Sequence, residues 1–244
     1  MPNPLVTARV LRGVGDGQFA YSVIVTAAQA TTPKFTFRAG APPAVVDWGD
    51  STARTAVVSG TELNHAYAAG GAYRVTLVMP NQAWWLQQID INSDKLSQVH
   101  TPIQQFTSLT AFRAYTNAAW AQNISGWVLP AGLTRFYVYS TSVSGDISGW
   151  VLPAGLLEFR VHTTSVSGCP VLSSMVAIRN ILAQDTALLQ ASVDLYLSRC
   201  VAREAATTYA TPALNLGGTN QDPSNPAGLA DKATLVAAGW VVTT

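Results

Sequence analysis

A ten-residue segment occurs twice, without change, in this chain of 244 residues. Residues 124–133 read Ile-Ser-Gly-Trp-Val-Leu-Pro-Ala-Gly-Leu, and the identical segment 147–156 begins 23 residues after the first. A segment that recurs at such a period is typical of one turn of a solenoid, because a single turn cannot bury its own apolar face and must stack on a copy of itself. The sequence therefore predicts a stack of turns over residues 81–183, with other segments that begin and end it.

The apolar spacing around the two copies sets the register of the predicted stack. The pattern Leu-x-x-Phe-x-Val begins at Leu133 and again at Leu156, and related patterns begin at Leu86 and Leu109. Residues 175–178, Met-x-x-Ile, are expected to continue the series in a shorter turn. A polar residue stands eight positions after each of the four leucines: Asp94, Asn117, Thr141 and Thr164.

This spacing resembles the leucine-rich repeat. The resemblance implies that each turn donates a short strand to a parallel sheet and that the polar residue satisfies backbone groups inside the turn. The segment 144–149, Ser-Gly-Asp-Ile-Ser-Gly, resembles the second half of such a repeat. Phe replaces Leu, and Thr replaces Asn in two turns, so the resemblance is to irregular bacterial or viral repeats.

Two tryptophans, Trp127 and Trp150, occupy equivalent positions in the two copies. Because Ile, Val and Leu surround them, we expect both rings to pack between neighbouring turns. An exposed pair that stacks on sugar rings is the alternative.

Alternation of side chains along each strand predicts which residues face outward from the sheet. Two columns result, one with Asp90, Arg113, Tyr137 and Arg160 and the other with Asn92, Tyr115, Tyr139 and His162. Solenoids use their concave face for recognition, and Tyr and Arg are enriched at protein interfaces, so these eight residues are the candidate binding patch. An ordinary solvated or subunit-contacting sheet face is the alternative.

The first 80 residues are expected to contain two β regions. Residues 1–30 form the N-terminal β segment, in which the glycine cluster 13–17 is a hairpin turn rather than a phosphate loop, because a β-branched strand and not a helix follows. Residues 31–80 contain Trp48-Gly49-Asp50, followed by His-x-Tyr at 65–67 and Gly-x-Tyr-x-Val-x-Leu at 71–77.

These motifs resemble the Ig-like domain of the polycystic-kidney-disease (PKD) type. The resemblance implies a β-sandwich in which the motif residues have structural roles rather than catalytic or metal-binding ones: Asp47, Trp48, Asp50, His65, Tyr67 and Tyr73. Ser51 stands where that family has glycine.

The last region, residues 184–244, is predicted to be a helical cap with a final repeat strand. A helix to about residue 205 carries apolar residues at helical spacing, at Leu189, Val193, Tyr196/Leu197 and Cys200. A strand over 211–216 and a short helix starting near Pro226 follow, with Leu229, Leu235 and Val236 expected to face the core and a strand over 240–244 to close the chain. This order resembles the C-terminal cap of repeat proteins from bacteriophage and prophage structural genes.

The amino-acid composition and the missing motifs argue against several classes of function. With 14 Lys and Arg against 13 Asp and Glu, the net charge of the chain is too small to attract nucleic acid or an anionic membrane. No run is long enough to span a bilayer, the N-terminus lacks a signal-peptide pattern, and the two cysteines, Cys169 and Cys200, are expected to be buried free thiols. We expect no cofactor and no metal site, because the three histidines are scattered and no enzyme motif is present.

The sequence thus predicts a mainly β chain with some α structure: an Ig-like sandwich, a short leucine-rich-repeat solenoid and a helical C-terminal cap. The family resemblances imply a non-enzymatic bacteriophage virion protein, in the capsid decoration or in the tail or fibre, made in the host cytoplasm. Its expected partners are other virion proteins, further copies of itself, and a host-surface glycan or protein. The alternatives are a bacterial surface adhesin and, third, a carbohydrate-degrading tailspike.

Overall fold

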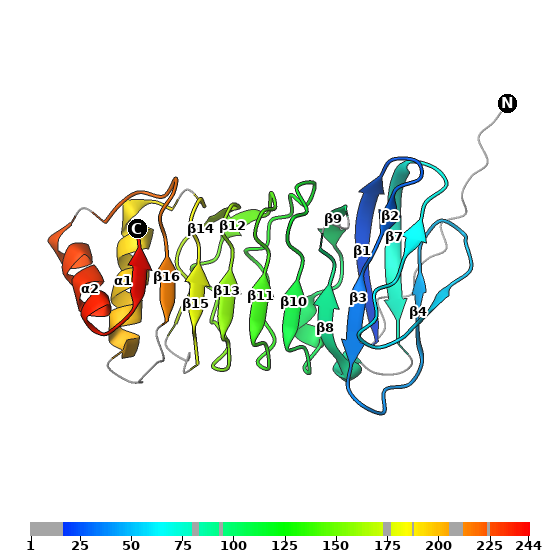
Figure 1. Cartoon of the computed structure of the whole chain (residues 1–244), viewed down its shortest axis with the longest axis horizontal. Helices are drawn as coiled ribbons and strands as arrows, with labels where there is room; N and C mark the ends of the chain where they lie inside the picture. Colours follow the sequence, from blue (N-terminus) through cyan, green and yellow to red (C-terminus); the bar gives the residue numbers. More distant parts are fainter. Residues whose placement is uncertain are drawn as a thin grey trace.

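The computed structural model describes residues 17–79, 83–92, 95–172, 177–186, 188–204, 212–223 and 225–244. The strand expected over residues 5–11, most of the glycine turn, Asp94 and Met175 lie outside the described residues. The described chain is mainly β with two helices, and its repeats stack into an elongated solenoid, as the sequence predicted (Figure 1). Antiparallel strands form one end of the molecule, and the two helices lie at the other.

An eight-stranded sheet runs along the solenoid. In spatial order its strands are β17 (Val241–Thr243), β16 (Ala213–Asn215), β15 (Asn180–Leu182), β13 (Glu158–Arg160), β11 (Arg135–Tyr137), β10 (Ala111–Arg113), β8 (Leu86–Asp90) and β3 (Lys34–Phe37). All neighbours from β8 to β17 are parallel, and β3 pairs antiparallel with β8. Each solenoid turn therefore contributes one short strand, and β3 closes the first edge.

The strand pairing confirms the register of the first four turns and corrects that of the fifth. Phe112 pairs with Phe136, and Phe136 with Phe159, so the aromatic residues form one row inside the sheet. Phe159 then pairs with Ile181, not with Ile178. The prediction that residues 175–178 open the fifth turn was therefore wrong, and the turn begins at Ile178. Several apolar residues in this segment could start the fifth turn. Only the pairing with the preceding strand decides which of them does so.

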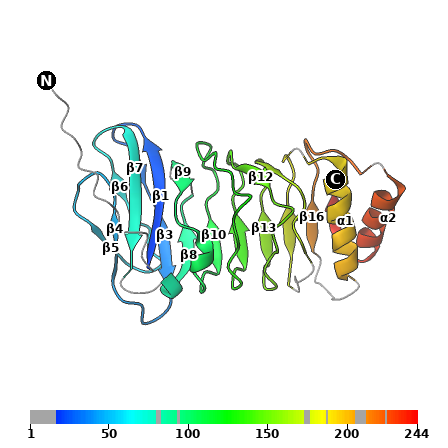
Figure 2. The same cartoon turned by 180° about the vertical axis from the view of Figure 1, so that it is seen from behind.

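Short strands also lie along a second line of the solenoid, at the top in Figure 1 and Figure 2. There β9 (Leu96–Val99) belongs to the first turn, and β12 (Ser144–Asp146) pairs in parallel with β14 (Ser165–Ser167). Two 3-10 helices, η1 (Ala83–Trp85) and η2 (Ile103–Gln105), complete the first turn.

The predicted polar column lies inside the turns and satisfies backbone groups, as expected. Asn117 is 2% exposed, accepts a hydrogen bond from the Leu96 amide at 3.1 Å and donates to the Ile91 carbonyl at 2.7 Å. The hydroxyls of Thr141 and Thr164 each donate at 2.6 Å to the carbonyl three residues before them. Buried polar groups are stable only when they are hydrogen-bonded, so this column helps to fix each turn.

The residue before each described member of this column has a positive φ, and so does Asp185, which precedes the buried Thr186 in the fifth turn. Thr116, Ser140, Thr163 and Asp185 have φ values of 60°, 54°, 54° and 55°. A left-handed residue turns the chain sharply at the end of each strand and allows the next side chain to point inward.

A second sheet at the N-terminal end has the order β5 (Thr55–Val57), β4 (Ala44–Asp47), β7 (Gly71–Val78), β1 (Gln18–Val25) and β9. A small ladder, β2 (Ala30–Thr31) with β6 (His65–Ala66), lies beside it. Strand β1 pairs with β9, and β3 pairs with β8, so both sides of the first solenoid turn continue into the N-terminal strands. Strand pairing thus crosses the expected boundaries at residues 30 and 80, and one continuous hydrophobic core serves both regions.

Two helices close the C-terminal end. Helix α1 (Gln190–Glu204) buries the positions expected from its periodicity, Val193, Tyr196, Leu197 and Cys200, whereas Leu189 precedes the helix and is 66% exposed. Helix α2 (Pro226–Ala237) begins at Pro226, and the Asn225 side chain accepts from the Gly228 amide.

Only one of the three residues expected to be buried from α2 is buried. Leu235 is fully buried, but Leu229 and Val236 are each 52% exposed. The prediction was wrong for these two because α2 packs on α1 and β17 and nothing in the described chain lies beyond it.

Both cysteines are buried free thiols, as predicted. Burial raises the pKa of Cys169 to about 12 and also raises that of Cys200.

Candidate functional site

The eight residues of the candidate binding patch lie together on the outer side of the eight-stranded sheet. Asp90, Arg113, Tyr137 and Arg160 are aligned across four neighbouring strands by the pairing of β8, β10, β11 and β13. Asn92, Tyr115, Tyr139 and His162 lie two residues further along each chain segment. Because a parallel in-register stack repeats each position at the strand spacing of about 4.8 Å, equivalent side chains contact one another directly.

The first column is a chain of charge and aromatic contacts. Arg113 Nη1 lies 3.1 and 3.0 Å from the two carboxylate oxygens of Asp90. The guanidinium carbons of Arg113 and Arg160 lie 5.9 and 4.7 Å from the centre of the Tyr137 ring. The Tyr137 hydroxyl donates to Glu158 Oε2 at 2.7 Å. Each charge is thus held by a neighbour on the next strand, which orders the long side chains before any partner binds.

Glu158 is the functional candidate that the sequence prediction missed. Besides Tyr137, its carboxylate contacts Arg160 at 2.5 Å and Arg135 at 3.5 Å. The signal was present, because Glu158 lies two residues before Arg160 and the same alternation places it on the outer face. The predicted columns left out this third row, which also contains Gln88 and Arg135.

These contacts shift the ionisation of the patch. Burial and the Glu158 carboxylate raise the pKa of Tyr137 to about 12. Burial would raise the pKa of Glu158, but the hydroxyl of Tyr137 and the guanidinium of Arg160 outweigh it and hold that pKa below its ordinary value. Burial also raises the pKa of Tyr139. Near neutral pH Tyr137 and Tyr139 therefore keep their protons, and Glu158 is ionised and accepts from Tyr137.

The second column is a stack of rings. Tyr115 and Tyr139 stack with centroids 4.5 Å apart and planes 7° apart, and Tyr139 stacks on His162 at 4.4 Å and 11°. Both faces of the Tyr139 ring and one face of the Tyr115 ring are therefore covered by stacked neighbours. Burial, followed by the charge on Arg160, lowers the pKa of His162, so the imidazole is neutral in this stack near pH 7.

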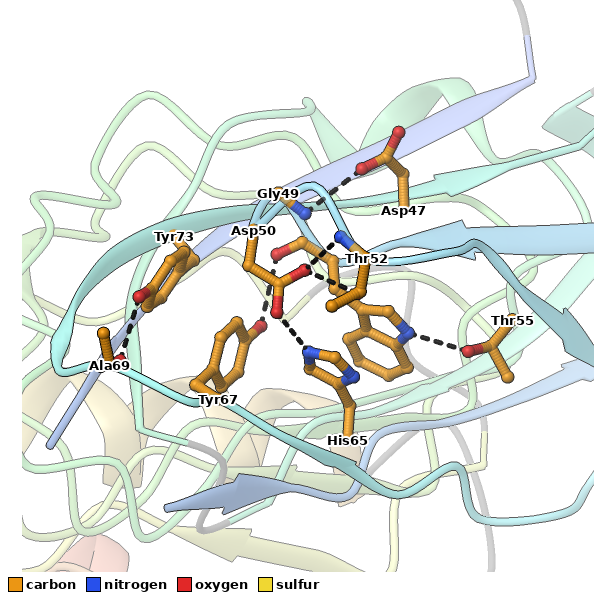
Figure 3. Close-up of polar contacts among 10 residues, drawn as sticks. Asp47, Gly49, Asp50, Thr52, Thr55, His65, Tyr67, Ala69 and Tyr73 are labelled. Atoms are coloured by element: carbon orange, nitrogen blue, oxygen red, sulfur yellow. Dashed lines mark hydrogen bonds and ion pairs between the residues drawn. The ribbon is translucent and has the colours of Figure 1, made fainter. Parts of the chain in front are cut away.

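Figure 3 shows the second group of predicted residues, in the N-terminal strands. His65 Nε2 lies 2.7 Å from Asp50 Oδ2, and the imidazole stacks on Trp48 with centroids 4.5 Å apart. The Tyr67 hydroxyl donates to the Trp48 carbonyl at 3.3 Å, and the Tyr73 hydroxyl donates to the Ala69 carbonyl at 2.9 Å. The His65 and Asp50 side chains are 13% and 10% exposed, so this cluster lies largely inside the fold.

Backbone geometry explains the turn that holds Asp50. The Asp47 carboxylate accepts from the Gly49 amide at 3.1 Å, and Asp50 Oδ1 accepts from the Thr52 amide and hydroxyl at 3.1 and 2.6 Å. Gly49 has φ 78°, and a Cβ there would lie 2.4 Å from the Arg74 carbonyl oxygen. Ser51, two residues after Gly49, also adopts a positive φ, of 69°.

The Asp50 carboxylate is stabilised in its charged form by these contacts. Burial would raise its pKa, but hydrogen bonds from Thr52 and His65 outweigh burial and lower it below the ordinary value of 3.8.

The described residues lack two structural features. They contain no cluster of three or more His, Cys, Asp or Glu side chains placed to hold a metal ion. No helix among them is long and apolar enough to cross a membrane.

Comparison of the chain with protein-family models, curated proteins and solved structures found no match. The described chain is a mainly β repeat solenoid. The outer surface of its sheet is ordered by contacts among its own charged and aromatic side chains.

Proposed function

We propose that this chain is a non-enzymatic structural and binding protein of a bacteriophage virion, in a capsid decoration or in the tail or fibre. In this proposal the solenoid recognises a neighbouring virion protein, another copy of itself or the host surface through the outer face of its sheet. The observation that carries the proposal is the preordered patch, because ordering side chains before contact lowers the entropic cost of binding. Tyr and Arg are also the residues most enriched at interface hot spots.

We further assign the N-terminal strands to the PKD-type Ig-like class. Three contacts support this assignment: the Asp47–Gly49 turn, the packing of Trp48 against His65 and Tyr67, and the Tyr73 hydroxyl bond to a carbonyl four residues upstream. The last contact resembles the tyrosine corner of Ig-like sandwiches. The pairing of β1 and β3 with the first solenoid turn makes this region an N-terminal cap as well as a point of attachment.

The repeats fit an irregular leucine-rich repeat with a C-terminal helical cap. One parallel strand per turn, a buried polar column and a closing helix support this assignment. Phenylalanines replace the usual leucines in the strand row, and they stack on one another at 5.8 and 5.9 Å.

A bacterial adhesin that binds glycan or protein through Tyr115, Tyr137 and Tyr139 is the second candidate. The structure disfavours one form of it, in which open tyrosine faces stack on sugars, because these faces are already covered by Tyr, Arg and His neighbours. Binding through hydroxyls and ring edges is compatible with both candidates.

Two experiments test the proposal. Mass spectrometry of gradient-purified phage particles from the source should find the chain at stoichiometric copy number, and its complete absence would leave the adhesin. Release of new reducing ends from host polysaccharide would instead support a tailspike enzyme.

The patch itself is tested by replacing Tyr137 and Tyr139 with Ala. We expect at least a tenfold loss of binding to purified particles or host cells, since hot-spot truncations cost about 2 kcal/mol or more. Thr243→Ala is the matched control, because Thr243 is exposed on the same sheet at the far strand β17. Unchanged binding of the tyrosine variant would exclude this face as the recognition surface.

A further inference from the structure

The two identical decapeptides differ in the hydrogen bonding of one atom, the indole nitrogen of their tryptophan. Trp150 is 4% exposed, and its indole nitrogen donates to the Ser125 carbonyl of the preceding turn at 2.9 Å. Trp127 is only partly buried, and its indole nitrogen makes no hydrogen bond to a described residue. The expected packing between turns is therefore complete at Trp150 and incomplete at Trp127.

The preceding turn explains the difference. The residue 23 positions before Ser125 is Pro102, where the chain does not repeat the decapeptide but enters η2. The Trp127 ring keeps its edge-to-face contact with Phe112, at 5.8 Å and 81°, just as Trp150 keeps the same contact with Phe136, at 5.7 Å and 82°. The Trp127 ring and Pro102 line the same groove, so the segment that contains Pro102 lies beside Trp127 where Ser125 lies beside Trp150.

A groove of about 200 Å³ lies at this place. Trp127 and Gly126 form one side, and the remaining lining comes from Val99, His100, Thr101, Pro102, Gln104 and Gln122. The lining includes two glutamine amides, a hydroxyl and an imidazole but no charged side chain. The Thr101 hydroxyl and the Gln122 amide already bond to the backbone of Ala20 and Val99, whereas Gln104 is exposed. Burial, followed by the charge on Arg74, lowers the pKa of His100, so the groove is uncharged near pH 7.

We propose that this groove binds a neutral sugar residue of a glycan chain. A sugar ring offers hydroxyl oxygens that accept from the Trp127 N–H, hydroxyls that bond to the exposed Gln104 amide, and an apolar C–H surface for the indole edge. Ligand sites combine an apolar wall with a few polar groups in this way. The volume of about 200 Å³ suits one monosaccharide unit. The site is distinct from the tyrosine and arginine patch, so it stands whether or not that patch binds a partner.

Titration of ¹⁵N-labelled protein with neutral oligosaccharides of glucose, galactose, mannose and N-acetylglucosamine tests the proposal. The chain has seven tryptophans, and the variants Trp127→Phe and Trp150→Phe identify the two relevant indole N–H signals. We expect at least one oligosaccharide to shift the Trp127 signal in the millimolar range while the Trp150 signal stays in place.

Affinity measurements on variants complete the test. Trp127→Ala should weaken binding at least tenfold, and Trp127→Phe about fivefold, since one hydrogen bond contributes about 1 kcal/mol. Gln104→Ala, at an exposed residue, should weaken binding without affecting folding, and Val151→Ala one turn away should leave it unchanged.

Three results would overturn the assignment: no indole shift with any neutral oligosaccharide, unchanged affinity in Trp127→Phe and Gln104→Ala, or shifts produced only by charged oligosaccharides or peptides. The last result would assign the groove to a different ligand class.

Discussion

The two copies of the decapeptide have the same ten residues and almost the same backbone, yet their environments differ. Trp127 lines a groove and its N–H has no acceptor among the described residues, whereas Trp150 is buried and donates to Ser125 of the first copy. The second copy rests on the first, but the first rests on a segment of different sequence. In a solenoid, each turn is therefore completed by the turn before it, and identical sequences acquire different roles from their neighbours.

The test with the largest expected effect removes the tryptophan ring from each copy in turn. Trp150→Ala should lower the free energy of unfolding by about 4 kcal/mol, because a buried aromatic ring leaves a cavity against Phe136. Trp127→Ala should lower it by about half as much, since part of the ring already contacts water. Urea denaturation measures both values. Equal losses would mean that the two sites are buried alike in solution.

A finer test removes the N–H and keeps an aromatic ring at each position. Trp150→Phe should lower the free energy of unfolding by about 1–2 kcal/mol, because the Ser125 carbonyl loses its donor. Trp127→Phe should change it by less than about 0.5 kcal/mol, as surface substitutions generally do. Thermal unfolding of the two variants gives the difference. A matching loss at Trp127 would show that its N–H has an acceptor in the protein.

A smaller difference is expected at the last glycine of each copy. An added Cβ at Gly155 meets no atom within 4 Å, whereas at Gly132 it comes 3.4 Å from the Thr107 carbonyl oxygen. Gly155→Ala should therefore raise stability by about 0.5 kcal/mol by restricting the unfolded chain, and Gly132→Ala should raise it less. Differential scanning calorimetry resolves this order, and a reversed order would contradict the packing at residue 132.

Acid should leave both copies unaffected, because neither contains an ionisable side chain. Asp50 in the N-terminal strands has a lowered pKa when folded, so its contribution to stability is fully present above its ordinary pKa of 3.8 and is lost as the pH falls through the folded-state value. Hydrogen exchange at decreasing pH should show residues near Asp50 opening before residues 124–156. Asp50→Asn should remove that pH dependence, and early opening of the copies would contradict it.

Much of the fold follows from local patterns in the sequence. The period of about 23 residues, the alternation in the strands and the polar column at Asn117, Thr141 and Thr164 all reappear in the structure. Each of these depends on a residue and its equivalents one turn away, so a repeated sequence contains the information. The same alternation placed the eight patch residues on one face.

Other features depend on contacts that no local pattern contains. The sequence after residue 172 does not repeat the pattern of the earlier turns. The start of the fifth turn at Ile178 and the exposure of Leu229 and Val236 are therefore set by contacts in the folded chain. Glu158 became central only once Tyr137, Arg160 and Arg135 were seen around its carboxylate.

The sequence by itself determined that this chain stacks turns, which residues form the buried rows and which face outward, because side-chain periodicity is a property of the local backbone. Only the tertiary structure decided how β1 and β3 join the first turn, that the tyrosine faces cover one another, and that Trp127 differs from Trp150. These features depend on which segments meet in space, and burial and hydrogen-bond partners are set by those neighbours.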